Sequence, residues 1–139
     1  MTSAFVIDCS ITMAWCFSDE ETAKTSQILD QLATASAVVP SLWFLEVANV
    51  LAVAERHKRI SAGESDQFVS LLATLDIEVD DQAHGRAFSH LLPLCRSQRL
   101  TSYDAAYLDL AMRRNLPLAS LDDNLRRGAK AARVKLLGK

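Results

Sequence analysis

The chain has 139 residues and a formal net charge of −2; half of its residues are hydrophobic and 23% are charged. With only four glycines and three prolines, this composition excludes a disordered or collagen-like chain, and the length excludes a two-domain enzyme. We therefore expect a single domain over residues 1–139, large enough to form a core without disulfides or a structural metal.

The residues that bear on cellular location favour the cytoplasm. Cys9, Cys16 and Cys95 form no CxxC pair, which is typical of free thiols in a reducing compartment. The apolar run Ala4 to Ile7 is too short for a signal-peptide core, because Asp8 interrupts it. No apolar stretch approaches the roughly 18 residues of a membrane helix. We therefore expect a cytoplasmic protein with no membrane partner.

Charge is distributed unevenly along the chain. Residues 1–69 carry four basic and nine acidic side chains, whereas residues 70–139 carry eleven basic and eight acidic ones. In the last thirty residues, eight basic side chains face only two acidic ones. Such a run can attract a phosphate backbone, or it can be an ordinary solvated helix face, and the sequence leaves both interpretations open.

Apolar periodicity predicts strands alternating with helices along the whole chain. Short continuous or alternating apolar runs predict five strands, at residues 5–7, 37–39, 76–80, 118–121 and 134–137. Apolar residues at helical spacing predict the intervening helices, at about residues 10–17, 20–35, 41–57, 61–75, 87–95, 101–114 and from 122 onward. This alternation indicates an α/β fold whose parallel sheet is covered on both faces.

Several helix ends carry local signals. Ser41 is expected to cap the longest helix, and Ser61 to Glu64 form a capping box. Thr101 or Ser102 is expected to cap a later helix. Pro93 should bend or interrupt the helix that contains it, because proline lacks a backbone N–H.

Two aspartates directly follow predicted strands. Asp8 ends the first strand and Asp122 follows the fourth, so both are expected at the carboxyl edge of the sheet, where such folds bind ligands. Asp122 could instead serve only as a helix N-cap, and Asp123 could share that duty.

Two further carboxylates lie within predicted helices. Glu46 lies in a run, Leu42 to Leu51, that is apolar around nearly its whole circumference. An unpaired carboxylate there would be costly, so Glu46 should meet a metal, a water-filled cleft or a basic partner. Asp104 lies in a first helical turn, where the helix dipole favours a negative charge, and this alone could explain it.

The remaining acidic residues are expected to be solvated, in loops, caps or polar faces. They are Asp19, Glu20, Glu21, Asp30, Glu55, Glu64, Asp66, Asp76, Glu78, Asp80, Asp81 and Asp109.

The four other carboxylates, Asp8, Glu46, Asp104 and Asp122, would repel one another in one crevice unless a cation lay between them. Mg²⁺ or Mn²⁺ prefers such oxygen ligands. The three histidines lack zinc-ligand spacing and are expected at the surface: His57, His84 and His90.

Four segments resemble, in order, the motifs of the PIN-domain nucleases, and within them the VapC-like ribonuclease toxins of type II toxin–antitoxin pairs. The segments are Asp8-Cys-Ser10 with Trp15 and Asp19 to Glu21, Pro40 to Asn49, Ser102 to Ala111, and Leu116 to Asp122. Gly128 departs from the family pattern, where helix-favouring residues are more usual, and so does Pro93.

The resemblance implies a PIN-like three-layer α/β/α fold with a five-stranded, mainly parallel sheet. It implies an endoribonuclease that uses Mg²⁺ or Mn²⁺ to hydrolyse single-stranded or structured RNA, forms a homodimer and is silenced by a cognate antitoxin. The residues it implies as catalytic and metal-binding are Asp8, Glu46, Asp104 and Asp122, with Ser10, Asn49 and Ser120 in support.

Two other functions remain open at this point. A PIN-like domain could bind RNA or protein without cutting, although the presence of all four acids speaks against this. A flavodoxin-like phospho-receiver also has an aspartate after its first strand. It needs a phospho-acceptor after its middle strand and a lysine after its last, which Asp80 and Lys135 fit poorly.

Overall fold

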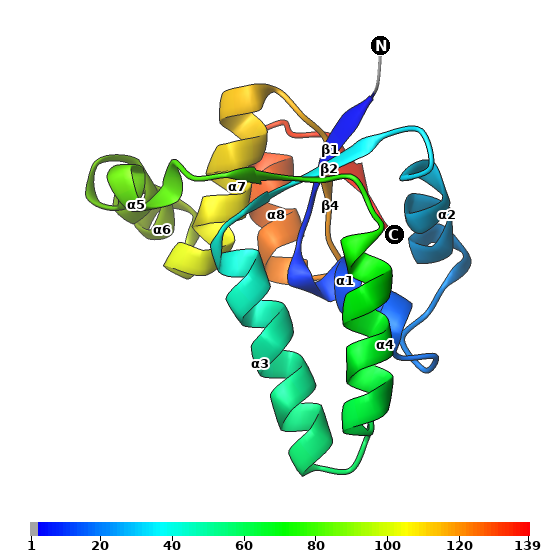
Figure 1. The fold of residues 1–139 in the computed structure, drawn as a ribbon. Helices are drawn as coiled ribbons and strands as arrows, with labels where there is room; N and C mark the ends of the chain where they lie inside the picture. The colour runs from blue at the N-terminus through cyan, green and yellow to red at the C-terminus, as the bar shows by residue number, and fades with distance from the viewer. Residues whose placement is uncertain (1–2) are drawn as a thin grey trace.

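A computed structural model describes residues 3–139 (Figure 1). Its five strands form one all-parallel sheet in the order β3-β2-β1-β4-β5. The strands are β1 (Ala4–Ile7), β2 (Ser36–Pro40), β3 (Ile77–Asp80), β4 (Leu118–Ala119) and β5 (Leu136–Leu137). The helices are α1 (Cys9–Cys16), α2 (Ala23–Gln31), α3 (Leu42–Arg56), α4 (Ala62–Ala73), α5 (Ala83–Arg86), η1 (Ala87–Leu91), α6 (Leu92–Gln98), α7 (Ser102–Arg114) and α8 (Asp123–Ala131).

The strand order fixes the layers. The chain runs from β1 outward to β3 and then returns to place β4 on the other side of β1. Because parallel crossovers are right-handed, the helices α1–α4 lie on one side of the sheet and α5–α8 on the other (Figure 1). The predicted three-layer α/β/α fold is confirmed. The order differs from the 2-1-3-4-5 order of flavodoxin-like folds, which removes the fold basis for a phospho-receiver.

Most predicted helix ends are confirmed, with two corrections. Ser61 and Glu64 form the expected capping box, and Thr101 caps α7 by accepting the Asp104 N–H at 3.1 Å. Ser41 makes no capping hydrogen bond, because its own backbone is already helical. The second helix is shorter than predicted, since Thr22 caps it and it ends at Gln31.

The segment around Pro93 is interrupted, as predicted. A π-helical turn, η1, separates α5 from α6, and the Leu92 N–H bonds the Ala87 carbonyl, five residues back. Pro93 follows in the first turn of α6, where its missing N–H costs nothing.

The core is densest where α7 crosses the sheet. Every residue from Ala105 to Ala111 is buried. Val6 and Ile7 of β1 and Leu118 of β4 have no exposed surface.

Within the described chain, no helix has the length and apolar character needed to cross a membrane.

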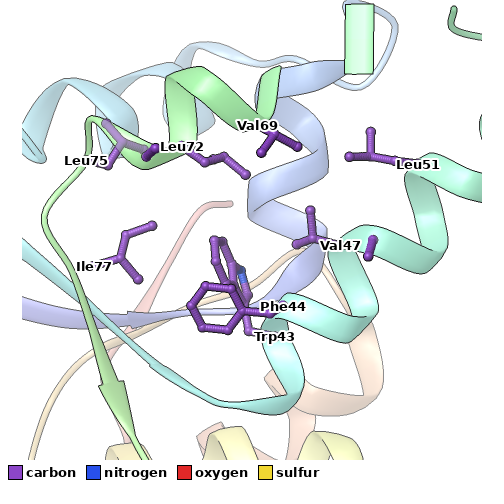
Figure 2. Close-up of a pocket in the computed structure, with 10 residues that line it drawn as sticks. Trp43, Phe44, Val47, Leu51, Val69, Leu72, Leu75 and Ile77 are labelled. Carbon is purple, nitrogen blue, oxygen red and sulfur yellow. The ribbon is translucent and has the colours of Figure 1, made fainter. Parts of the chain in front are cut away.

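Helices α3 and α4 form an antiparallel hairpin that extends beyond the sheet (Figure 1). The sequence suggests that α3 is buried around its circumference, but only one stripe is buried, made of Trp43, Val47, Leu51 and Ala54. Phe44 is 48% exposed and Leu45 74% exposed. An apolar groove of about 420 Å³ lies between the two helices, and Figure 2 shows the side chains that point into it.

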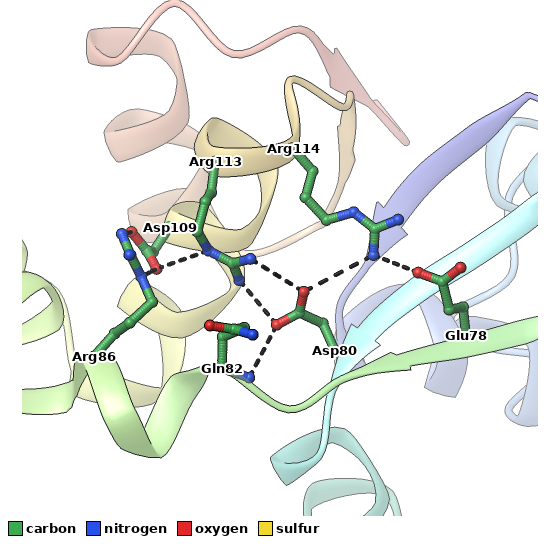
Figure 3. A network of polar contacts seen from close by, with 7 residues as sticks. All are labelled: Glu78, Asp80, Gln82, Arg86, Asp109, Arg113 and Arg114. Atoms are coloured by element: carbon green, nitrogen blue, oxygen red, sulfur yellow. Dashed lines mark hydrogen bonds and ion pairs between the residues drawn. The ribbon is translucent and has the colours of Figure 1, made fainter.

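An ion-pair network joins β3, the α5 region and α7, which corrects the expectation that Asp80 and Asp109 are solvated (Figure 3). The Asp109 side chain is only 12% exposed and accepts the Arg86 Nε–H at 2.7 Å. The Asp80 side chain is 10% exposed and accepts two hydrogen bonds from Arg113. Burial acts to raise the pKa of Asp80, but Arg113, the Gln82 N–H and Arg114 together outweigh it, so the pKa is lowered.

Candidate acidic site

The candidate site lies at the carboxyl edge of the sheet, between β1 and β4. Strand order reverses at this point, so the segments that follow the two strands diverge and leave room for a ligand. Asp8 follows β1 directly, and Ser120 and Asp122 follow β4. The sequence prediction that Asp8 and Asp122 lie at one edge of the sheet is therefore met.

Asp8 is buried and held by hydrogen bonds. Its Oδ1 accepts the Ser10 hydroxyl at 2.6 Å and the Ile11 N–H at 3.1 Å, and its Oδ2 accepts the Ser120 hydroxyl at 2.5 Å. Burial raises the pKa of Asp8, these three hydrogen bonds lower it in part, and the charge of Asp122 raises it further. The carboxylate is therefore fixed in orientation but costly to ionise without a cation.

Ser10 and Ser120 also connect the two segments. The Leu121 N–H donates to the Ser10 hydroxyl at 2.9 Å, and the Asp122 N–H donates to the Ser120 hydroxyl at 3.0 Å. Each serine thus bridges Asp8 to the loop that leads into α8. Asp122 then caps α8 by accepting the Leu125 N–H at 2.9 Å.

Glu46 is half-buried on α3 and has a tyrosine partner instead of the basic one left open by the sequence. The Tyr107 hydroxyl donates to Glu46 Oε1 at 2.6 Å. Burial raises the pKa of Glu46, the Tyr107 hydrogen bond lowers it, and the charge of Asp8 raises it. Sequence reasoning missed Tyr107, although its position three residues after Asp104 places it one helical turn further along α7.

Asp104 shows the strongest sign of a shared acidic environment. Burial raises its pKa to about 6, and the charges of Asp122, Asp8 and Glu46 each contribute to that rise. No hydrogen bond to its carboxylate is formed by any residue of the described chain. A helix dipole would favour the charged form of Asp104, whereas the raised pKa means that the charged form is disfavoured. The dipole alone therefore does not explain Asp104.

Two other candidates lie outside this group. Asn49, one turn after Glu46, is exposed and makes no side-chain hydrogen bond within residues 3–139. Asp123 is exposed and pairs with Lys139 at 2.7 Å, so it does not share the environment of Asp122. The three histidines are exposed, as predicted.

The charges of Asp8, Glu46 and Asp122 raise the pKa of Asp104, but the four carboxylates do not converge on one point. Among residues 3–139, no three His, Cys, Asp or Glu side chains meet the geometry of a formed metal site. Mg²⁺ nevertheless needs only one or two protein carboxylates when waters and substrate phosphate complete its shell. An unbonded Asp104 carboxylate among three others offers hard oxygen ligands and a need for positive charge, so the residues fit such a cation.

The fold and this edge define an α/β protein with an acidic site at the switch point of a parallel sheet. The sequence profile of the PIN domain matches residues 5–131, and the chain belongs to the PIN domain family. The family predicted from the sequence motifs is confirmed. No curated protein matches the chain significantly.

Two solved structures share the fold. One is PAE2754 from Pyrobaculum aerophilum, with a TM-score of 0.69 and 21% identity over 92% of this chain and 87% of that one. The other is VapBC2 from Rickettsia felis, bound to a DNA fragment from its promoter, with a TM-score of 0.68 and 12% identity over 96% of each chain. At these identities, the likeness concerns the fold alone.

Proposed function

We propose that this PIN-domain protein is an endoribonuclease that depends on Mg²⁺ or Mn²⁺. In this proposal, Asp8, Glu46, Asp104 and Asp122 are its catalytic and metal-binding carboxylates. The observation that carries the proposal is the raised pKa of Asp104, because burial among three other carboxylates is destabilising unless a cation binds there.

The chain's own residues have distinct roles in this proposal. A bound divalent cation would stabilise charge on the scissile phosphate and lower the pKa of a bound water. Ser10 and Ser120 orient Asp8, and Tyr107 orients Glu46. The Asp104 carboxylate has no hydrogen-bond partner in the described chain and is free to bind the cation or accept a proton. Hydrolysis by water leaves a 5′-phosphate and a 3′-hydroxyl.

We further infer that the protein is the toxin of a toxin–antitoxin pair. Support comes from the motif resemblance to VapC-like toxins and from a fold shared with a VapBC2 complex. The proposal includes a homodimer, a cognate antitoxin, a single-stranded or structured RNA substrate and a cytoplasmic location. The groove between α3 and α4, with exposed Phe44 at its rim, offers apolar surface for a protein partner.

The direct test is cleavage of an end-labelled single-stranded RNA by the purified protein with Mg²⁺, with Mn²⁺ and with EDTA. We expect cleavage only with a divalent cation, products with 5′-phosphates, and no cleavage by Asp104→Asn. RNA binding without cleavage under all conditions would instead support the non-catalytic alternative.

The antitoxin proposal has a separate test. We expect a small protein encoded beside this gene to copurify with the chain and to inhibit RNA cleavage. A basic side chain of that partner, paired with the carboxylates, would compete with Mg²⁺. If saturating partner changes neither cleavage nor Mg²⁺ affinity, direct occlusion of the acidic site is wrong.

A further inference from the structure

The basic run near the C-terminus separates into two groups in the structure. Arg113 and Arg114 pair with carboxylates of β3, and Arg126 donates to the Ser120 and Leu137 carbonyls. Lys139 pairs with Asp123, so these four side chains are engaged within the fold. Four others are exposed, and no carboxylate of the described chain lies within ion-pair distance of them: Arg127, Lys130, Arg133 and Lys135.

Arg127 lies in the second turn of α8, the helix that begins at the acidic site. Asp122 caps the helix, and a rise of 1.5 Å per residue places Arg127 about 7 to 8 Å further along its axis. Its guanidinium donates to the Gln98 carbonyl at 2.8 Å and to Asn124 Oδ1 at 3.0 Å. Both partners are neutral, so the positive charge of Arg127 is not compensated.

Arg99 belongs to the same surface. It directly follows Gln98, whose carbonyl Arg127 contacts, and it precedes the first turn of α7, which carries Asp104. Arg99 is exposed, and no ion pair or side-chain hydrogen bond involves it within residues 3–139.

The packing of α8 keeps these segments together. A Cβ at Gly128 would lie 3.1 Å from a Leu100 methyl and 3.3 Å from a Leu108 methyl. The absence of a side chain at Gly128 therefore lets α8 approach Leu100 closely. This explains the departure from the family pattern at Gly128 and holds Arg127 next to the segment that carries Arg99.

Few negative charges face this surface. On the side of α8 that faces β5, a cleft of about 450 Å³ is lined by Arg126, Arg127 and Lys130, and its one acidic residue is Asp123. Asp123 is already paired with Lys139. Helix α6, which leads to Arg99, contains Arg96 and no carboxylate.

We propose that Arg99 and Arg127 form a phosphate-binding pair that holds an RNA backbone beside the acidic site. This proposal rests on the proposed ribonuclease function. The carboxylates repel a polyanion, and two guanidinium groups on neighbouring segments supply compensating attraction on the flanking nucleotides. Because they contact phosphate, they fix the register of the strand and carry no base specificity. A merely solubilising role would make the positions of these two arginines unimportant.

The test compares two double variants that remove the same charge. One is Arg99→Gln with Arg127→Gln; the control is Arg133→Gln with Lys135→Gln. Each pair includes one arginine with left-handed backbone, Arg99 at φ 54° or Arg133 at φ 61°. The control residues lie after the end of α8 and at the start of β5, which is the sheet edge opposite the acidic site.

Binding of a short fluorescein-labelled single-stranded RNA is measured by anisotropy in an Asp104→Asn background, where no cleavage is expected. We expect Kd to rise about ten-fold for the Arg99 and Arg127 pair and less than two-fold for the control. The slope of log affinity against log salt should fall by about 1.4, because each lost phosphate contact on a single strand removes about 0.7. Equal losses in both pairs, or none in either, would overturn the proposal.

Two further measurements keep the result unambiguous. Arg99→Gln alone breaks no ion pair and no side-chain hydrogen bond within residues 3–139, so it must weaken binding even if the double variant is unstable. Cleavage by the wild-type chain with Mg²⁺ is assayed separately. Absent cleavage with intact, arginine-dependent binding contradicts the ribonuclease proposal, whereas normal cleavage with arginine-independent binding contradicts the phosphate-binding pair.

Discussion

The Tyr107 hydroxyl donates a 2.6 Å hydrogen bond to Glu46, a residue 61 positions away in the sequence. Tyr107 is 1% exposed, so packing determines where its hydroxyl points. The bond joins α7, which carries Asp104, to α3, which carries Glu46. It thereby sets the position of one acidic side chain relative to another.

Tyr107→Phe should weaken metal binding while preserving the fold. The phenyl ring still fills the core, but Glu46 loses the group that orients it. Loss of a residue that orients a metal ligand typically costs 10- to 100-fold in affinity or activity, and we expect the Mg²⁺ concentration for half-maximal cleavage to rise by about that range. Tyr103→Phe, at a tyrosine that is 60% exposed, is the matched control. Identical Mg²⁺ titrations for both variants would show that Tyr107 has no positioning role.

Asp104→Asn should abolish cleavage and stabilise the metal-free protein at pH 7.5. The substitution removes a charge that burial and three carboxylates disfavour. One pKa unit corresponds to about 1.4 kcal/mol, and partial solvent exposure reduces the effect, so we expect a gain of about 1 to 2 kcal/mol. Urea unfolding with EDTA measures it. A less stable variant would contradict the repulsion that we infer.

The pH dependence of stability provides a second measure of the same environment. The pKa of Asp104 is raised from 3.8 to about 6 in the folded protein, so the folded state retains a proton that the unfolded chain loses. The stabilisation is fully present below pH 3.8 and is lost as pH rises through about 6. Relative to Asp104→Asn, the metal-free wild type should therefore lose stability over this window. A difference between the two proteins that does not change with pH would place Asp104 outside the cluster.

Asp109→Asn should destabilise the protein by about 2 kcal/mol, because it leaves the partly buried Arg86 without its carboxylate and removes one of the two carboxylates near Arg113. Arg86 contacts Asp109 at 2.7 Å and Arg113 lies 3.6 Å from it. Asp19→Asn is the matched control, since Asp19 pairs with Arg59 while its side chain is 73% exposed. We expect the control to change the free energy of unfolding by less than about 1 kcal/mol. Thermal unfolding of both variants decides whether burial sets the strength of these pairs.

Gly128→Ala should lower the melting temperature despite the higher helix propensity of alanine. Alanine gains about 1 kcal/mol in a helix interior, but overpacking costs about 1 to 3 kcal/mol. The new methyl would lie 3.3 Å from Leu108, which is fully buried and has little room to move. Gly63→Ala, on α4, has only the Ser61 hydroxyl within 4 Å and should be neutral or stabilising. A melting temperature raised by Gly128→Ala would mean that α8 can shift away from Leu100.

The sequence alone was enough for most of the local structure and for the family. Apolar periodicity predicted the strands. Asp8 and Asp122 each follow a predicted strand, and parallel strands end on the same side of a sheet, so both aspartates were predicted at one sheet edge. Capping signals at Ser61 and Thr101 depend only on residues three positions apart. Such features are decided within a few residues, and the structure confirms them.

Only the tertiary structure decided which side chains meet across the fold. Asp80 and Asp109 look like ordinary surface acids in the sequence, but arginines from α5 and α7 bury them. The sequence pattern suggests only a core role for Tyr107, whereas in the structure α3 places Glu46 next to its hydroxyl. The apolar run in α3 suggests burial all around, yet one face stays exposed because the α3–α4 hairpin extends past the sheet. Periodicity reports a residue's place on its own helix or strand, whereas burial, ion pairing and pKa depend on which distant element packs against it.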